Sequence, residues 1–269
     1  MASSERATDA LDTSVAHIAR VYDYLLGGKD NFEADRAAGD AMLQAYPDIA
    51  NSMRSNRQFL ARSVRYLAED EGVRQFLDVG TGIPTANNTH EVAQSIAPDC
   101  RVVYVDRDPV VLIHARALLT SLPQGVTDYI EADIRDPQTI LTHAASVLDF
   151  SQPIALMLVA ILHFVPAGDH PYEIVATLLD ALPAGSFLTL SHPGLDVDAA
   201  APEAARRFNS RAAEQATLRS HDDVMRFFDG LDMVEPGLVQ VQDWRPTAPA
   251  LGTISASGTS VWAGVARKP

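Results

Sequence analysis

Long apolar runs are missing from this sequence of 269 residues. A helix needs roughly 20 consecutive apolar residues to cross a bilayer, and no segment approaches that length. The first twelve residues are polar and acidic, and they lack the basic-then-apolar order of a secretory signal peptide. We therefore expect a cytoplasmic protein with no membrane partner.

Cysteine and basic residues are also scarce. The single cysteine, Cys100, excludes an intramolecular disulfide and a cysteine-based metal cluster. The His, Asp and Glu residues show no metal-ligand spacing, so we expect no catalytic metal. Asp and Glu number 35 against 21 Lys and Arg, and the resulting net charge of −14 repels phosphate backbones. We expect no nucleic-acid partner and a small or medium-sized substrate.

The N-terminal part of the chain has a helical pattern throughout. Apolar residues recur at helical spacing, and Gly27-Gly28 and Tyr46-Pro47 interrupt the pattern. The sequence predicts helices from Ser14 to Gly27, from Asn31 to Tyr46, and from Ile49 to Ala68. We interpret residues 1–74 as a helical extension and residues 75–269 as the main domain.

Beyond residue 75, short apolar runs alternate with helical stretches. Repeated strand–helix units predict an α/β fold with a doubly wound, mainly parallel sheet. A closing pair of strands is expected at the C-terminal end. The expected strands are Gln75–Val79, Arg101–Val105, Thr127–Glu131, Ile154–Val159, Phe187–Leu190, Leu238–Gln242 and Thr259–Ala266. The expected helices are Asn88–Ile96, Pro109–Leu119, Pro137–Val147, Pro171–Ala181, Pro202–Ala216 and His221–Phe228, and Trp244–Gly258 is expected to be a loop.

Three successive strands end in residues that suit a nucleoside. The first ends in Asp78-Val79-Gly80-Thr81-Gly82, where glycines allow a sharp turn and a close ligand. The second ends in Asp106, a carboxylate that can accept hydrogen bonds from both ribose hydroxyls. The third ends in Asp133-Ile134, which could bond the adenine amine and pack on the ring. Together they predict an adenosine-containing ligand.

The glycine turn also separates the candidate cofactors. The third glycine of the dinucleotide pattern G-x-G-x-x-G is absent, and no basic residue lies in the turn to hold a pyrophosphate. Asp78 would instead favour a cationic amine. This chemistry favours a sulfonium amino acid over a dinucleotide.

At these residues the sequence resembles the class I S-adenosylmethionine-dependent methyltransferases. More narrowly, it resembles a bacterial family within them long catalogued as a domain of unknown function. The shared segments are Val21–Phe32, Asn56-Arg57, Phe76–Gly82, Val103–Asp106, Leu162–Val165 and Leu190–His192. The resemblance implies a Rossmann-like, seven-stranded sheet with the last strand antiparallel, and S-adenosylmethionine as cofactor. It also implies that the cofactor is lined by Gly80, Thr81, Gly82, Asp106, Asp133 and Ile134.

The sequence identifies the reactive residues less clearly than the residues of the cofactor site. His163 follows the fourth strand and is the candidate general base, although a structural role is an equal alternative. If the N-terminal helices fold over the sheet as a lid, Lys29 or Arg57 could pair with the carboxylate of the cofactor. Tyr22 and Asn56 would then lie in the wall of the pocket.

Three hypotheses follow for the function. The leading one is a methyltransferase with a small-molecule acceptor, bound between the N-terminal helices and the segment His192–Arg219. A non-catalytic protein that binds the cofactor to sense or regulate is the alternative. A nicotinamide-dependent oxidoreductase is disfavoured, because neither a pyrophosphate-binding glycine nor a Tyr-x-x-x-Lys pair is in place. The identity of the acceptor and the oligomeric state are left open.

Overall fold

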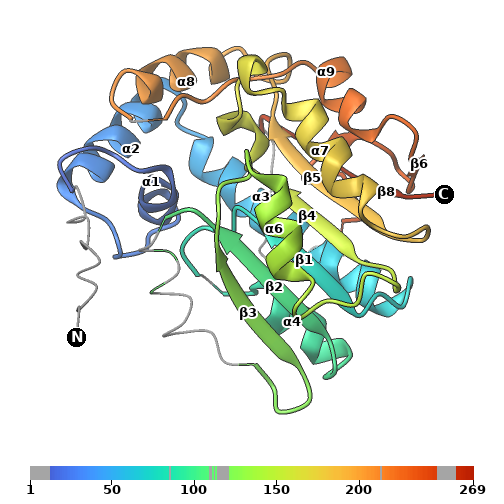
Figure 1. The fold of residues 1–269 in the computed structure, drawn as a ribbon. Coiled ribbons are helices and arrows are strands. Elements are labelled where there is room, and N and C mark those ends of the chain that lie inside the picture. Colours follow the sequence, from blue (N-terminus) through green and yellow to red (C-terminus); the bar gives the residue numbers. More distant parts are fainter. Residues whose placement is uncertain are drawn as a thin grey trace, which may run out of the picture.

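A computed structural model describes residues 13–84, 86–108, 111, 113, 121–212, 214–246 and 259–269. Across these residues a mixed sheet forms the centre of the molecule (Figure 1), with strand order β3-β2-β1-β4-β5-β8-β6 and β7 beside β8. Its strands are β1 Gln75–Val79, β2 Arg101–Asp106, β3 Val126–Glu131, β4 Ala155–Val159, β5 Phe187–Pro193, β6 Asp232–Met233, β7 Val239–Gln240 and β8 Val261–Arg267. The first five strands are parallel, and β8 is antiparallel to β5.

The short strands β6 and β7 share one edge of the sheet. Both pair with β8, β6 opposite Ala266 and Arg267 and β7 opposite Trp262 and Ala263. They therefore occupy a single position beyond β8, so the sheet has seven strand positions. The last strand in the chain, β8, is the antiparallel one. This confirms the predicted fold class, although β6 was not predicted.

Helices cover both faces of the sheet. On one face lie α6 Pro137–Ala144, α7 Pro171–Asp180 and α9 His221–Met225, and on the other α3 Ile49–Glu69 and α4 Thr89–Ile96. Side chains along a strand alternate between the faces, so Leu156 and Leu158 pack in the first layer whereas Ala155 and Met157 pack in the second. The helix predicted at Pro109–Leu119 lies largely outside the described residues, as does most of the loop Trp244–Gly258.

Three helices form a cap over the edge of the sheet where the parallel strands end (Figure 1). They are α1 Ile18–Leu25, α2 Glu33–Ala45 and α8 Ala201–Asn209, which share an apolar cluster with Phe164. The prediction that the helix from Pro202 continues to Ala216 was wrong, because α8 ends at Asn209. The side chain of Asn209 bonds both the backbone N–H and the carbonyl of Ala216, and these bonds close a loop instead.

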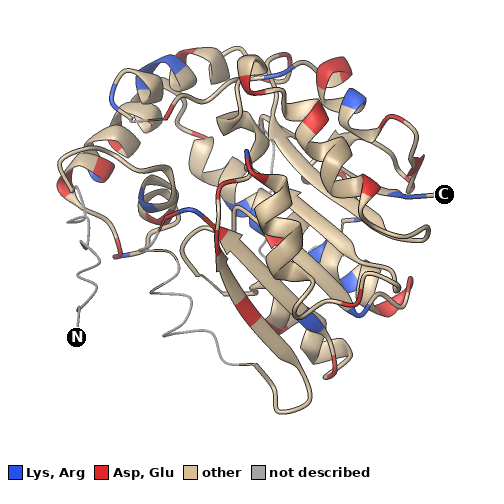
Figure 2. Cartoon of the chain, in the orientation of Figure 1, with Lys and Arg blue, Asp and Glu red and all other residues tan. Residues whose placement is uncertain are grey.

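Charged residues are dispersed over the molecule. Lys and Arg lie on several helices and connecting segments rather than in one cluster, and acidic residues are interspersed with them (Figure 2). No described helix combines the length and the apolar character needed to cross a membrane.

Candidate active site

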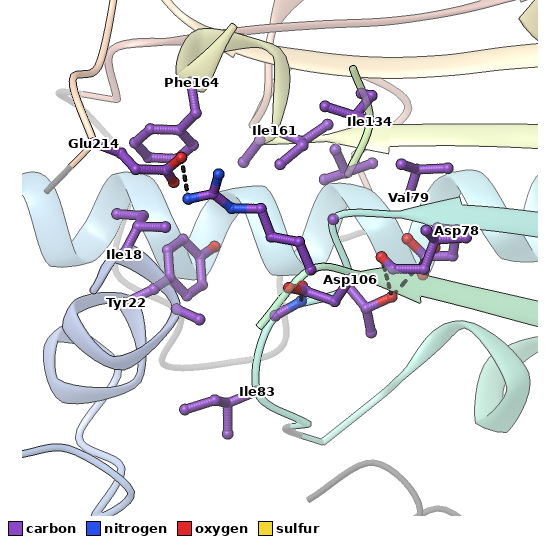
Figure 3. Close-up of a pocket in the computed structure, with 18 of the residues that line it drawn as sticks. Ile18, Tyr22, Asp78, Val79, Ile83, Asp106, Ile134, Ile161, Phe164 and Glu214 are labelled. Atoms are coloured by element: carbon purple, nitrogen blue, oxygen red, sulfur yellow. Dashed lines mark hydrogen bonds and ion pairs between the residues drawn. The ribbon is translucent and has the colours of Figure 1, made fainter. Parts of the chain in front are cut away.

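A cavity opens where β1, β2, β3 and β4 end, between the sheet and the helical cap. In Figure 3, Ile18, Tyr22, Phe164 and Glu214 lie along one side of this cavity, across from Asp78 and Val79. We call it the charged cavity, because charged side chains from both sides line it: Asp23, Arg57, Asp78, Asp106, Arg107, Asp133, Arg135 and Glu214. Ligands of open parallel sheets bind at this edge.

The turn after β1 needs its glycines for two different reasons. Gly80 and Gly82 both have left-handed backbones, with φ of +80° and +66°. A Cβ on Gly80 would also lie 2.6 Å from Ile161, whereas a Cβ on Gly82 would meet open space. Thr81 donates from Oγ1 to the carbonyl of Asp78 at 3.2 Å. The turn therefore brings backbone close to any ligand in the charged cavity.

Asp106 is held in one orientation by the backbone. Its Oδ2 accepts from the N–H of Gly82 and its Oδ1 from the N–H of Asp108, each at 2.9 Å. Burial raises the pKa of this carboxyl, although the two N–H donors act against the shift. Both oxygens keep lone pairs for a further donor, as the two hydroxyls of a ribose require.

Buried Asp78 and half-buried Arg57 bring opposite charges to the charged cavity, and together they fit an amino acid. Burial raises the pKa of Asp78 to about 6, opposed by a 2.6 Å hydrogen bond from Thr89 and by the charge of Arg57. Arg57 donates from Nη2 to the carbonyls of Ala86 and Asn87, but its buried Nε has no partner among the described residues. An ammonium beside Asp78 and a carboxylate on Arg57 Nε would satisfy both, so this end of the charged cavity fits the methionine part of S-adenosylmethionine.

Asp133, two residues after β3, also lines the charged cavity and is already bonded. Its oxygens accept from the backbone N–H of Arg135 at 2.9 Å, from Nη1 of Arg135 at 3.1 Å and from Nη1 of Arg107 at 3.2 Å. Burial raises the pKa of Asp133, but these donors together bring it below its usual value. Buried Ile134 lines the cavity beside it. Arg107 also forms an ion pair with Glu214, which joins the end of β2 to the segment after α8.

Lys29 and Arg57 lie in different environments in the structure. Arg57 lines the charged cavity, whereas Lys29 is exposed and is not among the lining residues. Gly27, with φ of +85°, ends α1 and turns the chain before Lys29. Of the two candidates, only Arg57 lies in the cavity, and its contact with a cofactor stays a prediction.

The segment Val21–Phe32 is organised around a buried aspartate. Asp23 accepts from the backbone N–H of Asp30 at 2.9 Å and from the side-chain amide of Asn31 at 2.8 Å. Gly28 must lack a side chain, because its Cβ would lie 1.9 Å from Asp23 Oδ1. The loop after α1 is thereby fixed. Tyr22, which precedes Asp23 on α1, lines the cavity and donates from its hydroxyl to the carbonyl of Met53 at 3.1 Å.

A second cavity adjoins the first inside the helical cap. We call it the apolar cavity, because its walls include Met42, Met53, Phe164, Phe208 and Val261. Its volume is about 110 Å³. The two cavities share the residues Ile18, Tyr22, Asn56, Ala160 and Phe164. A ligand in one cavity would therefore lie next to a ligand in the other.

His163 lines the apolar cavity and not the charged one. Its side chain is only 7% exposed, and its Nδ1 is buried without a hydrogen-bond partner among the described residues. Burial, together with His192 and Arg219, holds the pKa of His163 well below its usual value, so the ring is neutral at pH 7.

Hydrogen bonds from Arg219 and Thr217 hold the turn that carries His163. Buried Arg219 donates to the carbonyls of Leu162 and Val165 at 2.9 and 2.7 Å. It also contacts His192 Nε2 at 2.6 Å, and because Arg219 can only donate, His192 accepts there. The backbone N–H of Thr217 donates to the carbonyl of His163 at 2.7 Å. The position of His163 is thus set by the segment after α8.

Several cavity residues were missed at the level of sequence. Ala160 lines both cavities with a left-handed backbone, φ +56°, and its place directly after β4 was the available signal. Arg107 follows Asp106 and was accessible to the same reasoning. Ile18 and Glu214 had no such signal, because helices and loops of the cap bring them in.

Comparisons with known proteins agree with this geometry. A family model described as S-adenosyl methyltransferase matches residues 4–269. A DUF574 family protein from Streptomyces avermitilis is 46% identical, with a TM-score of 0.92 over 96% of this chain and 99% of that chain. A protein from Thermobifida fusca is 43% identical, with a TM-score of 0.88 over 98% of this chain and 99% of that chain. No curated protein matches the chain.

More distant structures share the fold alone. Human N-acetylserotonin methyltransferase, solved with S-adenosylmethionine, is 15% identical with a TM-score of 0.50, over 93% of this chain and 66% of that chain. The nearly full-length family match carries the assignment. The chain therefore belongs to the S-adenosyl methyltransferase family, and it is an S-adenosylmethionine-dependent methyltransferase.

Proposed function

We propose that this enzyme methylates a small molecule, with the cofactor in the charged cavity and the acceptor in the apolar cavity. The observation that carries the proposal is the shared wall of the two cavities at Tyr22, Asn56 and Ala160. Methyl transfer is an in-line displacement, so it requires donor and acceptor to be held side by side. The helical cap encloses the acceptor side, which favours a small molecule over a polymer.

The charged cavity holds the cofactor through charges at both ends. Asp106 accepts from the ribose hydroxyls, and Ile134 packs on the adenine ring. Asp133 accepts from the adenine amine in place of one of the arginine donors that it has in the free protein. Arg57 and Asp78 bind the carboxylate and the ammonium of the methionine part. Gly80, Thr81 and Gly82 supply the close backbone surface between these ends. The cofactor itself supplies an electrophilic methyl group on a sulfonium.

His163 is placed to receive the proton that the acceptor loses. A neutral imidazole can accept a hydrogen bond from an O–H or N–H group. Its low pKa makes His163 a weak base toward the free acceptor. As the new bond forms, however, the acceptor atom becomes positive and its proton becomes far more acidic, so a weak base is sufficient.

Binding of S-adenosylhomocysteine to matched variants tests the cofactor assignment. We expect Arg57→Met to weaken binding about 10- to 100-fold, because a charge-assisted hydrogen bond contributes roughly 1.5–3 kcal/mol. Lys29→Met removes the same charge outside the cavity and is the matched control. Isothermal titration calorimetry of the three proteins measures the difference.

We expect Arg57→Met to weaken binding and Lys29→Met to leave it unchanged. A loss of binding in Lys29→Met, with Arg57→Met unchanged, contradicts the proposed orientation of the cofactor. Absence of binding to the unmodified protein contradicts the proposed cofactor site altogether. A screen of candidate acceptors for methyl uptake from labelled S-adenosylmethionine then tests the small-molecule acceptor.

A further inference from the structure

The apolar cavity carries no formal charge. Among the described residues that line it there is no Asp, Glu, Lys or Arg. His163 is neutral, and buried Arg219 behind it donates to the carbonyls of Leu162 and Val165 and to His192. A charged acceptor would lose its hydration here without gaining a counter-charge. The walls therefore select against carboxylates, phosphates and ammonium groups.

Aromatic and sulfur-containing side chains form much of the wall. Tyr22 from α1, Tyr46 at the end of α2, Phe164 and Phe208 reach the cavity from four separate elements. Met42 and Met53 lie among them. Aromatic side chains pack by preference against ring edges and faces, and methionine sulfur makes favourable contacts with rings. This combination favours a flat ring over a sugar or a polar chain.

The size of the cavity limits the part of the acceptor that it encloses. Its volume of about 110 Å³ is somewhat below the roughly 150 Å³ of an engineered cavity that binds benzene. One six-membered ring is therefore close to the largest group that fits without movement of the walls. A fused ring system would require the cap to open.

One polar group in this wall lacks a partner. His163 Nδ1 is buried and bonded to no described residue, although the side chain lies in a cavity with few other polar atoms. A buried ring nitrogen without a hydrogen bond is costly, and a hydroxyl or amino group on a bound ring would remove that cost. Asn56, also in the wall, is already engaged, since its Oδ1 accepts from Ser191 at 2.6 Å.

We infer that the methyl acceptor is an uncharged, single-ring aromatic compound whose hydroxyl or amino substituent bonds His163. The inference rests on the proposed function, which assigns the apolar cavity to the acceptor. It adds the charge, the ring size and the hydrogen-bonding substituent of the molecule that binds there.

Three probes of similar size test the inference on the intact protein. p-Cresol has the ring, the hydroxyl and no charge; 4-hydroxybenzoate replaces the methyl group by a carboxylate; toluene lacks the hydroxyl. With the protein saturated with S-adenosylhomocysteine, we expect p-cresol to bind at least tenfold more tightly than either of the others. Isothermal titration calorimetry measures all three affinities.

Variants locate the binding and assign the hydrogen bond. Ala205 lines the apolar cavity on α8, and Ala205→Phe fills it, so we expect p-cresol binding to be lost. Ala145→Phe makes the same change at an exposed position beyond α6 and serves as the control. His163→Phe should bind p-cresol and toluene with nearly equal affinity, because the group that distinguishes them is gone.

The outcomes separate this inference from the function on which it rests. If S-adenosylhomocysteine fails to bind, the proposed function and the inference both fall. If it binds but 4-hydroxybenzoate matches p-cresol, or no probe binds, the inference alone is wrong. Unchanged p-cresol binding in a folded Ala205→Phe protein also overturns it, since the ring then binds elsewhere. If a variant does not fold, the comparison of the three probes on the unmodified protein still tests the inference.

Discussion

The charged cavity and the apolar cavity share a wall but are built in different ways. The charged cavity is formed chiefly by residues at the ends of β1 to β4, held by backbone hydrogen bonds such as those that fix Asp106. The apolar cavity is formed mainly by side chains of α1, α2, α3 and α8, which come from distant parts of the chain, together with His163 and Phe164 after β4. One is a set of fixed charges, and the other is a packed helical shell.

This difference matches the proposed tasks of the two cavities. A cofactor of constant structure can be bound by a fixed pattern of charges at the rigid edge of a sheet. An acceptor pocket in a cap of small helices can change its lining without disturbing that edge. Cofactor binding and acceptor choice are thereby placed on separate parts of the fold. Variants that affect one cavity and spare the other test this separation.

The largest effect is expected from Asp106→Ala. The variant removes both acceptors for the ribose hydroxyls and leaves the N–H groups of Gly82 and Asp108 unpaired. We expect S-adenosylhomocysteine to bind at least ~100-fold more weakly, from roughly 1.5–3 kcal/mol for each lost charged hydrogen bond. Calorimetry measures the change, with the exposed Asp180→Ala at the end of α7 as control. Wild-type affinity in Asp106→Ala would remove this residue from the cofactor site.

Arg219→Met tests the hydrogen bonds that hold the turn with His163 in the wall of the apolar cavity. The variant leaves the carbonyl of Val165 and Nε2 of His192 without a donor, whereas the carbonyl of Leu162 keeps the backbone N–H of Val165 at 3.1 Å. We expect the free energy of unfolding to fall by roughly 2–4 kcal/mol, since each buried unpaired group costs about 1–3 kcal/mol. The exposed Arg211→Met should change it by less than about 0.5 kcal/mol. Urea denaturation compares the two proteins.

The same variant should alter the titration of two histidines. Burial and then the charge of Arg219 are the two largest causes that hold the pKa of His192 at about 3, and Arg219 also lowers the pKa of His163. Loss of that charge should raise both pKa values, as NMR titration of the imidazole resonances can measure. Unchanged values would mean that burial alone keeps these rings neutral.

Gly80→Ala tests the turn of the charged cavity, against which Ile161 packs. Gly80 and Gly82 both have positive φ, so alanine at either costs about 1–2 kcal/mol in backbone strain. Only at Gly80 does the new Cβ meet Ile161, and overpacking adds about 1–3 kcal/mol. We expect Gly80→Ala to be the less stable protein in thermal or urea unfolding. The double variant with Ile161→Ala should recover the difference, and equal losses at the two glycines would contradict the contact.

The charged cavity could be predicted from sequence because strand ends are local features. Buried parallel strands appear as continuous apolar runs, and the residue that follows each run lies at the ligand-binding edge. Gly80, Asp106 and Asp133 were found in this way and line one cavity. Lys29 was not distinguished from Arg57, because the charges and the helix end at Gly27-Gly28 were visible in the sequence but the direction of the chain beyond that end was not.

The apolar cavity could not be predicted in the same detail. Its position between the N-terminal helices and the segment after β5 was expected, but its lining runs from Ile18 to Val261. Apolar residues at helical spacing look the same whether they pack in a core or line a cavity. The early end of α8 depends on the side-chain bonds of Asn209, and β6 has only two residues and no apolar run.

The smallest expected effect is a pH dependence of cofactor binding through Asp78. Burial raises the pKa of its carboxyl to about 6 in the free protein, and an ammonium bound beside it favours the charged form. Binding at pH 5 must therefore expel a proton from Asp78, whereas binding at pH 7 need not. One pH unit below the pKa corresponds to a factor of about ten, so S-adenosylhomocysteine should bind about tenfold more weakly at pH 5 than at pH 7. Calorimetry at several pH values measures the slope.

Asp78→Asn assigns this dependence to one group. Three neighbours act on Asp78: Thr89 donates to it, the charge of Arg57 lowers its pKa, and Asp106 is a second carboxyl whose own pKa is raised by burial. The asparagine variant binds more weakly at every pH, but its affinity should vary little between pH 5 and 7. If the full tenfold dependence persists in Asp78→Asn, the proton belongs to Asp106 or another group, and the ammonium of the cofactor does not lie beside Asp78.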